Sequence, residues 1–271
     1  MRFNSFLLFI SLSFCLLTNA QNTDNQQIDL LKIYSPELKV SKKIWVYIPE
    51  SYQTTKNAYP VIYMPEGQNL FSTKKGNKEE WAIDKILDSL DHPQSIIIGI
   101  ENAKKKRLAE LTPFKNDSYG GGNGDAYIDF IKNTLKPKID ATYRTKPNAK
   151  HTTIWGSTVG GLFSFYAVIR NPETFGNAGV FSPSFWFSES IYEYVQEMDI
   201  PDTSRFYFLA GTNNKEDLIA NQIRMVSLLE RKGVHKNNIH NKVVEGGIND
   251  KTMWNHQFLE AYLWLMASQF D

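Results

Sequence analysis

Short apolar runs rich in β-branched residues alternate with segments of helical periodicity along most of this 271-residue chain. Residues 95–100 (SIIIGI) form one such run, continuous enough for a strand buried on both faces. Residues 80–90 instead repeat their apolar side chains at the spacing of one helical face. Strands that alternate with helices predict an α/β fold, in which a mostly parallel central sheet carries helices on both faces.

The same patterns place the remaining elements. Strands are expected at 40–48, 61–64, 95–100, 152–155, 179–182, 205–210 and 241–244, and helices at 80–90, 126–143, 159–170, 188–197, 218–232 and 251–268. A long polar loop is expected over 102–124, in which Lys104–Arg107 is interpreted as a solvated face. Because no repeat, linker or change of composition divides the chain after its first twenty residues, we expect one domain over 21–271.

Residues 1–20 have the pattern of a secretory signal peptide. Arg2 is their only charge, an apolar run extends from Phe6 to Leu17, and small residues follow at Thr18 and Ala20. This run is shorter than the roughly 20 residues that a membrane-spanning helix needs. The sequence therefore predicts cleavage before Gln21 and export to the periplasm or the exterior, with no membrane span.

Composition excludes several classes of function. Cys15, the only cysteine, is expected to leave with the signal, so the mature chain has no disulfide, thiolate nucleophile or cysteine metal ligand. Removing Arg2 from the 30 basic residues leaves 29 against 29 acidic ones, a balance that does not favour nucleic acid. The spacing of the histidines matches no metal motif, and Gly120–Gly124 lacks the Lys-Ser/Thr of a phosphate loop. We expect no metal and no cofactor.

The strand that ends at Trp155 runs into the turn Gly156-Ser157-Thr158-Val159-Gly160-Gly161 and then into a helix. A strand, a glycine-flanked turn and a helix are the context of the G-x-S-x-G nucleophile elbow. The central position of that pattern is Thr158, and Ser157 precedes it with a side chain expected to point away. An ordinary strand-to-helix turn built of small residues is the alternative interpretation.

Eight stretches of the chain together carry a family resemblance. They are WVYIPESY, YPVIYMPEGQNLF, YGGGNGDAYIDFI, TYRT, WGSTVGGLFSFYA, GVFSPSFWFS, LAGTNN and VEGGIND, and they extend from about residue 40 to the C-terminus. In these stretches the chain resembles the putative-esterase family of α/β hydrolases, which includes enterochelin esterases and feruloyl-type carbohydrate esterases. The resemblance implies an α/β-hydrolase fold and ester hydrolysis by a Ser-acid-His triad.

Other residues occupy all three triad positions that the resemblance implies. The nucleophile position is Thr158, the acid position after Gly211-Thr212-Asn213 is Asn214, and the histidine position after Glu245–Ile248 is Asn249. An amide cannot act as a general base, and Asn214 carries no charge to stabilise an imidazolium. We therefore expect no confident catalytic residue. His256 is a weak substitute for the base, and Glu216 or Asp217 could supply a carboxylate.

The binding features that the resemblance implies are intact. The oxyanion hole would use the backbone N–H of Val159 and a second donor near Gly67 and Gln68. Aromatic side chains at Phe185, Trp186 and Trp254 are candidate ligand contacts, with core packing as the alternative for each.

Three functions stay open at this point. The first is a non-catalytic relative, a pseudoenzyme, that binds an ester-, glycan- or siderophore-like ligand or a protein partner. The second is a carboxylic ester hydrolase with unorthodox residues around Thr158, such as His256. The third is a purely structural or assembly subunit, for which the pocket would be closed or filled.

Overall fold

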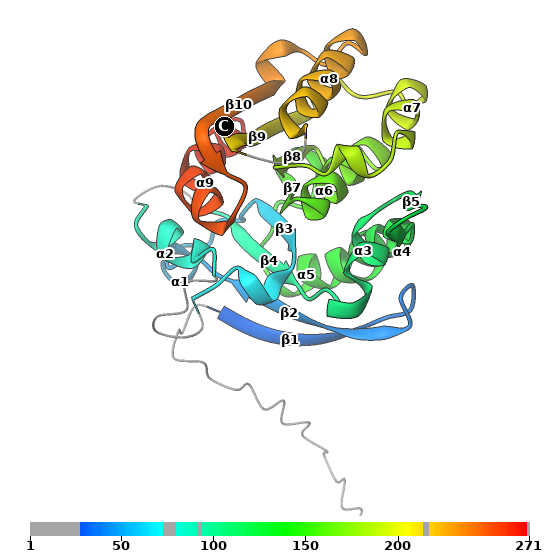
Figure 1. Ribbon diagram of the computed structural model, residues 1–271. Helices are drawn as coiled ribbons and strands as arrows, with labels where there is room; N and C mark the ends of the chain where they lie inside the picture. Colours follow the sequence, from blue (N-terminus) through cyan, green and yellow to red (C-terminus); the bar gives the residue numbers. More distant parts are fainter. Residues whose placement is uncertain (1–27, 73–79, 91–93, 214–216, 270–271) are drawn as a thin grey trace, which may run out of the picture.

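The computed structural model describes residues 28–72, 80–90, 94–213 and 217–269, and the predicted α/β-hydrolase fold is confirmed in these ranges (Figure 1). The predicted signal peptide and Asn214 lie outside the described residues.

One sheet of eight strands forms the centre of the molecule, in the order β1-β2-β4-β3-β7-β8-β9-β10. The six strands from β4 to β10 in this order are each parallel to their neighbours. The pairs β1–β2 and β2–β4 are antiparallel. The strands are β1 (Ile28–Ser35), β2 (Val40–Tyr47), β3 (Val61–Pro65), β4 (Ile96–Ile100), β7 (Thr152–Ser157), β8 (Asn177–Phe181), β9 (Arg205–Asn213) and β10 (Ile239–Ile248).

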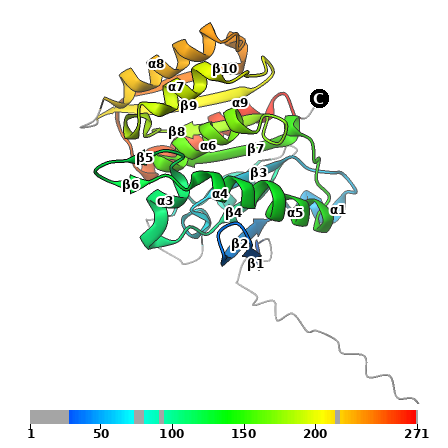
Figure 2. The same cartoon turned by 90° about the vertical axis from the view of Figure 1, so that its right-hand side faces the viewer.

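Helices cover both faces of this sheet. One apolar cluster joins one face to helices from α3 to α8, and a second joins the opposite face to α2 and α9. Figure 2 views the molecule from the side of α3 to α6. The helices are α1 (Ser51–Thr54), α2 (Ile83–Asp88), α3 (Arg107–Leu111), α4 (Gly124–Asp129), α5 (Lys136–Thr142), α6 (Val159–Arg170), α7 (Ser190–Glu197), α8 (Leu218–Arg231) and α9 (Lys251–Met266).

Burial explains why the central strands are continuous apolar runs. Every residue of β3, β4, β7 and β8 is buried, because helices cover both of their faces. Every residue of α6 except Arg170 is also buried, so this helix lies within the core. The segments that follow β3, β7 and β8 are thereby fixed at one edge of the sheet, where ligands bind in such folds.

Three segments differ from the sequence prediction. The edge strand β1 was not predicted, because all of its residues except Ser35 are exposed or half-buried and they form no apolar run. The strand depends on its antiparallel ladder with β2. The predicted polar loop over 102–124 contains α3 and a small hairpin of β5 (Lys115–Asn116) and β6 (Gly120–Gly121). The predicted helix over 126–143 is α4 and α5 joined by a π-helical turn, Phe130–Leu135.

Close backbone packing defines the turn between β7 and α6. A Cβ atom added at Gly156 would lie 2.4 Å from the carbonyl oxygen of Gly160, and one at Gly161 would lie 2.7 Å from the oxygen of Phe181. Both distances are too short for a side-chain carbon, so the glycines allow β7, α6 and β8 to meet.

We expect Gly156→Ala to lower the free energy of unfolding by about 3 kcal/mol, because the backbone at Gly160 must move to admit the methyl group. Gly160→Ala is the matched control. Its Cβ would meet nothing closer than 3.6 Å, and helix propensity predicts a gain of about 0.5–1 kcal/mol. Urea unfolding of the two variants checks this, and equal stabilities would contradict it.

Candidate functional site

Thr158 occupies a strained turn at the carboxyl edge of the sheet. Its φ of 54° and ψ of −119° are unfavourable for a β-branched residue. Its N–H donates to the oxygen of Phe181 at 2.9 Å, and its carbonyl accepts from the N–H groups of Leu162 and Ser184 at 3.0 and 3.1 Å. These bonds hold the backbone in place, and the side chain lines two neighbouring pockets.

The Thr158 hydroxyl is hydrogen-bonded to an arginine. Arg107 Nη2 donates to Thr158 Oγ1 at 3.0 Å and to Glu66 Oε2 at 2.9 Å, and Arg107 Nε donates to Glu66 Oε1 at 2.7 Å. Glu66 follows β3 in a left-handed conformation, with φ of 64°. The bridge thus joins the ends of β3 and β7 through the first residue of α3.

Sequence reasoning missed this bridge. Arg107 was assigned to a solvated run, but its side chain is only 35% exposed and its pairing with Glu66 is bidentate. The position of Glu66 directly after a predicted strand was the available signal, since polar residues there gather at the ligand-binding edge.

Asn249 lies between β10 and α9, and its side chain is held by two donors. Its Oδ1 accepts from the N–H of Gly211 at 3.1 Å and from the hydroxyl of Ser182. Ser182 in turn accepts from Trp254 Nε1 at 3.0 Å. Asn249 Nδ2 is buried and has no hydrogen-bond partner among the described residues.

Two pockets meet at Thr158 and Arg107. The first, of about 320 Å³, has Asn249 and Ser182 in its polar wall and Tyr119, Trp186 and Phe187 among its less polar residues. The second, of about 210 Å³, is lined by Glu66, Trp81, Lys251 and Trp254 among others. The predicted nucleophile and histidine positions, Thr158 and Asn249, therefore line one pocket.

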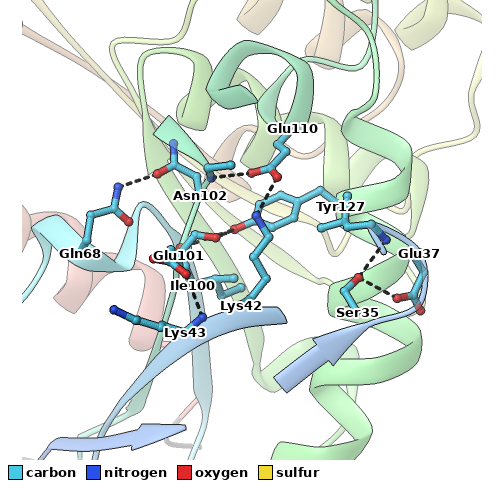
Figure 3. Close-up of polar contacts among 12 residues, drawn as sticks. Ser35, Glu37, Lys42, Lys43, Gln68, Ile100, Glu101, Asn102, Glu110 and Tyr127 are labelled. Carbon is cyan, nitrogen blue, oxygen red and sulfur yellow. Dashed lines mark hydrogen bonds and ion pairs between the residues drawn. The ribbon is translucent and has the colours of Figure 1, made fainter. Parts of the chain in front are cut away.

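The two predicted oxyanion donors have different positions. Val159 lines the first pocket and begins α6, so its N–H has no acceptor within the helix. Gly67 packs tightly under β4, where a Cβ would lie 2.5 Å from the carbonyl carbon of Gly99. The Gln68 side chain donates to Asn102 (Figure 3), and neither Gly67 nor Gln68 lines the two pockets.

The three predicted aromatic contacts also differ. Phe185 is fully buried and packs edge-on against Phe165 at 5.1 Å, so the core-packing alternative holds for it. Trp186 is 36% exposed and lines the first pocket beside Tyr119. Trp254 is buried, lines the second pocket and lies 5.4 Å from Trp81.

None of the described histidines lines either pocket. His256 is exposed on α9. Burial lowers the pKa of His240, which stacks on Tyr207, and lowers the pKa of His151, which lies just before β7 at the opposite edge of the sheet. Glu216 lies outside the described residues, and Asp217 directly precedes α8.

Within the described residues, no group of three or more His, Cys, Asp or Glu could hold a metal ion. No described helix is long and apolar enough to cross a membrane.

A buried ion pair fixes the helix that carries Arg107. Lys42 Nζ of β2 donates to Glu110 Oε1 of α3 at 2.7 Å, and the two side chains are 2% and 4% exposed (Figure 3). Glu110 Oε2 also accepts from the N–H of Ala103 at 2.9 Å. The ammonium lies 5.2 Å from the ring of Tyr127, whose pKa is raised by burial, so that ring stays neutral. Glu110 is thereby tied to both β2 and the start of the loop before α3.

Comparison with known proteins agrees with this architecture. A family model described as "Putative esterase" matches residues 35–265. An uncharacterized protein of Bacillus subtilis, YbbA, is 26% identical over 239 residues, which are 83% of this chain and 92% of that protein. A siderophore triacetylfusarinine C esterase of Aspergillus fumigatus is 26% identical over 151 residues, 53% of this chain and 50% of that protein.

A solved structure has the same fold. The crystal structure of an IroE-like serine hydrolase from Shewanella oneidensis superposes with a TM-score of 0.71 at 19% identity, covering 90% of this chain and 81% of that one.

We expect Lys42→Met to lower the free energy of unfolding by about 3–5 kcal/mol, because it leaves the Glu110 carboxylate buried without its cation. The double variant Lys42→Met/Glu110→Gln removes that charge and keeps an acceptor for the Ala103 N–H, so it should recover most of the loss. Thermal and urea unfolding of both variants measure the difference. A single variant as stable as the wild type would contradict the expectation.

Proposed function

Because this chain belongs to the putative esterase family, we propose that it is an exported, catalytically inactive member that binds an ester-, glycan- or siderophore-like ligand in the pocket beside Thr158. The esterase of Aspergillus fumigatus is named for a siderophore substrate, which supports a small-molecule ligand of that class. A protein partner on the same surface is the less specific form of the proposal.

The contact between Arg107 and Thr158 is the observation that carries the proposal. Nucleophilic attack by a hydroxyl requires a base that removes its proton. Here the hydroxyl oxygen accepts a hydrogen bond from a guanidinium, which stays protonated in proteins and only donates. The nearest charged group to this oxygen therefore cannot activate it.

The other groups around Thr158 do not supply a base either. Asn249 Oδ1 already accepts two hydrogen bonds, and an amide takes no proton near neutral pH. Glu66 is the carboxylate among the described residues that line the two pockets, and both of its oxygens accept from Arg107. Protonation of Glu66 would break a bidentate ion pair, which opposes its use as a base.

The strained turn at Thr158 and the pocket beside it favour ligand binding over a purely structural role. The strained backbone at Thr158 costs roughly 1–3 kcal/mol, and the chain keeps it beside a pocket of about 320 Å³. A subunit that served only for assembly would need neither.

The alternative is an ester hydrolase that uses Thr158 and His256. It ranks second because the His256 side chain is exposed on α9 and lines neither pocket.

We expect purified chain 21–271 to hydrolyse short-chain nitrophenyl esters and feruloyl esters no faster than its Thr158→Ala variant. The reason is that no described group near Thr158 can accept the hydroxyl proton. The measurement is the initial rate of acid or nitrophenol release. Turnover by the wild type that is lost in both Thr158→Ala and His256→Ala would establish the alternative.

A gain-of-function variant serves as the matched control. Thr158→Ser/Asn214→Asp/Asn249→His returns the three side chains of a triad to a frame that is otherwise unchanged. Hydrolysis by this variant above the wild-type rate would show that the assay detects activity in this fold.

We expect the exported chain to begin at Gln21, since Ala20 ends the small-residue motif that signal peptidases cleave. N-terminal sequencing of the protein recovered outside the cytoplasm measures the cleavage site. An intact Met1 terminus on that protein would refute export through this signal.

A further inference from the structure

A third pocket lies at the opposite edge of the sheet from Thr158. It has a volume of about 380 Å³ and forms where three parallel strands begin, with Lys150 just before β7, Asn177 at the start of β8 and Arg205 at the start of β9. This amino-edge pocket is larger than either pocket at Thr158 and shares no lining residue with them. A ligand bound here would therefore occupy a separate site.

Arg205 lines the amino-edge pocket and has no carboxylate partner. Its Nη1 donates to Asn238 Oδ1 at 3.2 Å, its Nη2 donates to the carbonyl oxygen of Trp264 at 3.0 Å, and the guanidinium lies 4.2 Å from the Trp264 ring. None of the ion pairs among the described residues includes it. Since a guanidinium carries five N–H groups, each terminal nitrogen keeps a second N–H that these bonds do not use.

Arg170 shows how a half-buried arginine is compensated elsewhere in the same protein. Its Nη1 lies 2.8 Å from Asp129, and its Nε lies 3.4 Å from Asp125. Burial alone would lower the pKa of Arg170, but the hydrogen bond to Asp129 and the charges of both carboxylates raise it. Burial lowers the pKa of Arg205, and no carboxylate acts in the opposite direction. The charge of Arg205 is thus partly desolvated without a counter-ion among the described residues.

Positive charge also prevails around the rest of this pocket. Lys150 is exposed at its rim, and the described residues that line it include no Asp or Glu. His151, the next residue in the chain, is affected by the same excess of charge. Burial lowers the pKa of His151, and the charges of Lys146 and Lys150 lower it further. The amino-edge pocket therefore attracts a negatively charged ligand.

Ser204 adds a neutral donor to the wall. This residue lines the pocket and is only 2% exposed, and its backbone N–H donates to the oxygen of Pro201 at 3.0 Å. Its hydroxyl forms no hydrogen bond with a described residue, and its oxygen is not one of the fully enclosed polar atoms that lack a partner. The hydroxyl therefore opens onto the pocket, where a ligand can accept from it.

The remaining wall is largely aliphatic. Ala149, Pro172 and Pro201 contribute to it, and the described lining residues include no aromatic ring. The two prolines fix their backbone torsions, so this part of the wall is preformed. A volume of about 380 Å³ suits a compact aliphatic ring or branched chain that carries one charged group.

From these contacts we infer that the amino-edge pocket is a second ligand site, which binds a small aliphatic monocarboxylate with its charged group beside Arg205, Lys150 and Ser204. The aliphatic body of the ligand packs against Pro172 and Pro201. A carboxylate is favoured because its planar pair of oxygens matches the geometry of a guanidinium. The inference goes beyond the function proposed for the pocket at Thr158 and does not depend on it.

Isothermal titration calorimetry of chain 21–271 with cyclohexanecarboxylate and cyclohexanecarboxamide tests the inference. The two probes have nearly the same shape and differ in charge. We expect the acid to bind about tenfold more tightly than the amide, since hydrogen bonds to a charged acceptor are stronger than those to a neutral one. Inorganic phosphate, which has charge but no apolar body, should bind about tenfold more weakly than the acid.

Three variants locate the contact. Ser204→Ala removes one donor and should weaken binding of the acid by about tenfold. Arg205→Gln removes the half-buried charge, with an expected loss of about a hundredfold. Lys150→Gln removes an exposed charge and should cost only about threefold, because solvent screens it.

Two control variants should leave the affinity unchanged. Lys32→Gln removes an exposed charge from β1, at the far end of the strand order from β7 to β10. Thr158→Ala alters the pockets at the opposite edge of the sheet. A loss of acid binding in Thr158→Ala that is absent in Ser204→Ala would place the ligand at the other edge and overturn the inference.

The remaining outcomes are equally decisive. Equal or tighter binding of the amide, binding of phosphate as tight as that of the acid, or no binding of the acid at millimolar concentration each overturns the inference. The ester-hydrolysis assay is read independently, so failure of one proposal does not imply failure of the other. If Arg205→Gln unfolds, as circular dichroism would reveal, Ser204→Ala and Lys150→Gln still decide the matter.

Discussion

The backbone contact between the end of β7 and the start of α6 is the constraint on which the site depends. Gly156 and Gly161 leave no room for a Cβ, so β7, α6 and β8 meet at backbone distance and Thr158 adopts its strained conformation between them. This geometry comes from the glycines and the backbone hydrogen bonds of Thr158. The same backbone geometry would hold any side chain at position 158 at this edge of the sheet. The conformation of the turn therefore does not depend on the chemistry of that side chain.

Around Thr158, the recorded hydrogen bonds come from donor groups of neighbouring residues. Arg107 donates to both Glu66 and Thr158, and Asn249 is held by Gly211 and Ser182 with its Nδ2 buried. In a serine hydrolase, by contrast, a histidine hydrogen-bonded to the nucleophile takes its proton. Here the hydrogen bond that the structure records at Thr158 Oγ1 comes from a permanent cation, which cannot take the hydroxyl proton.

The sequence predicted the central strands and helices well, because buried elements show up locally as continuous apolar runs or as apolar residues at helical spacing. The helix predicted over 159–170 coincides with α6, and the glycine-flanked turn lies where it was expected. Features that depend on distant partners were not visible. Edge strand β1 exists through its ladder with β2, and no local pattern indicates which cation of the run Lys104–Arg107 pairs with Glu66, 41 residues away. Phe185 and Trp186 are adjacent, yet one is core and the other rims the pocket, a difference set by tertiary packing.

The presence of an asparagine at position 249 also affects how the first pocket responds to pH. The described residues that line the first pocket include no histidine and no carboxylic acid, the side chains whose charge ordinarily changes between about pH 4 and 8. The charge of this wall is therefore constant over that range. A small molecule that entered this pocket would therefore meet the same wall charge across that pH range, whatever its own ionisation.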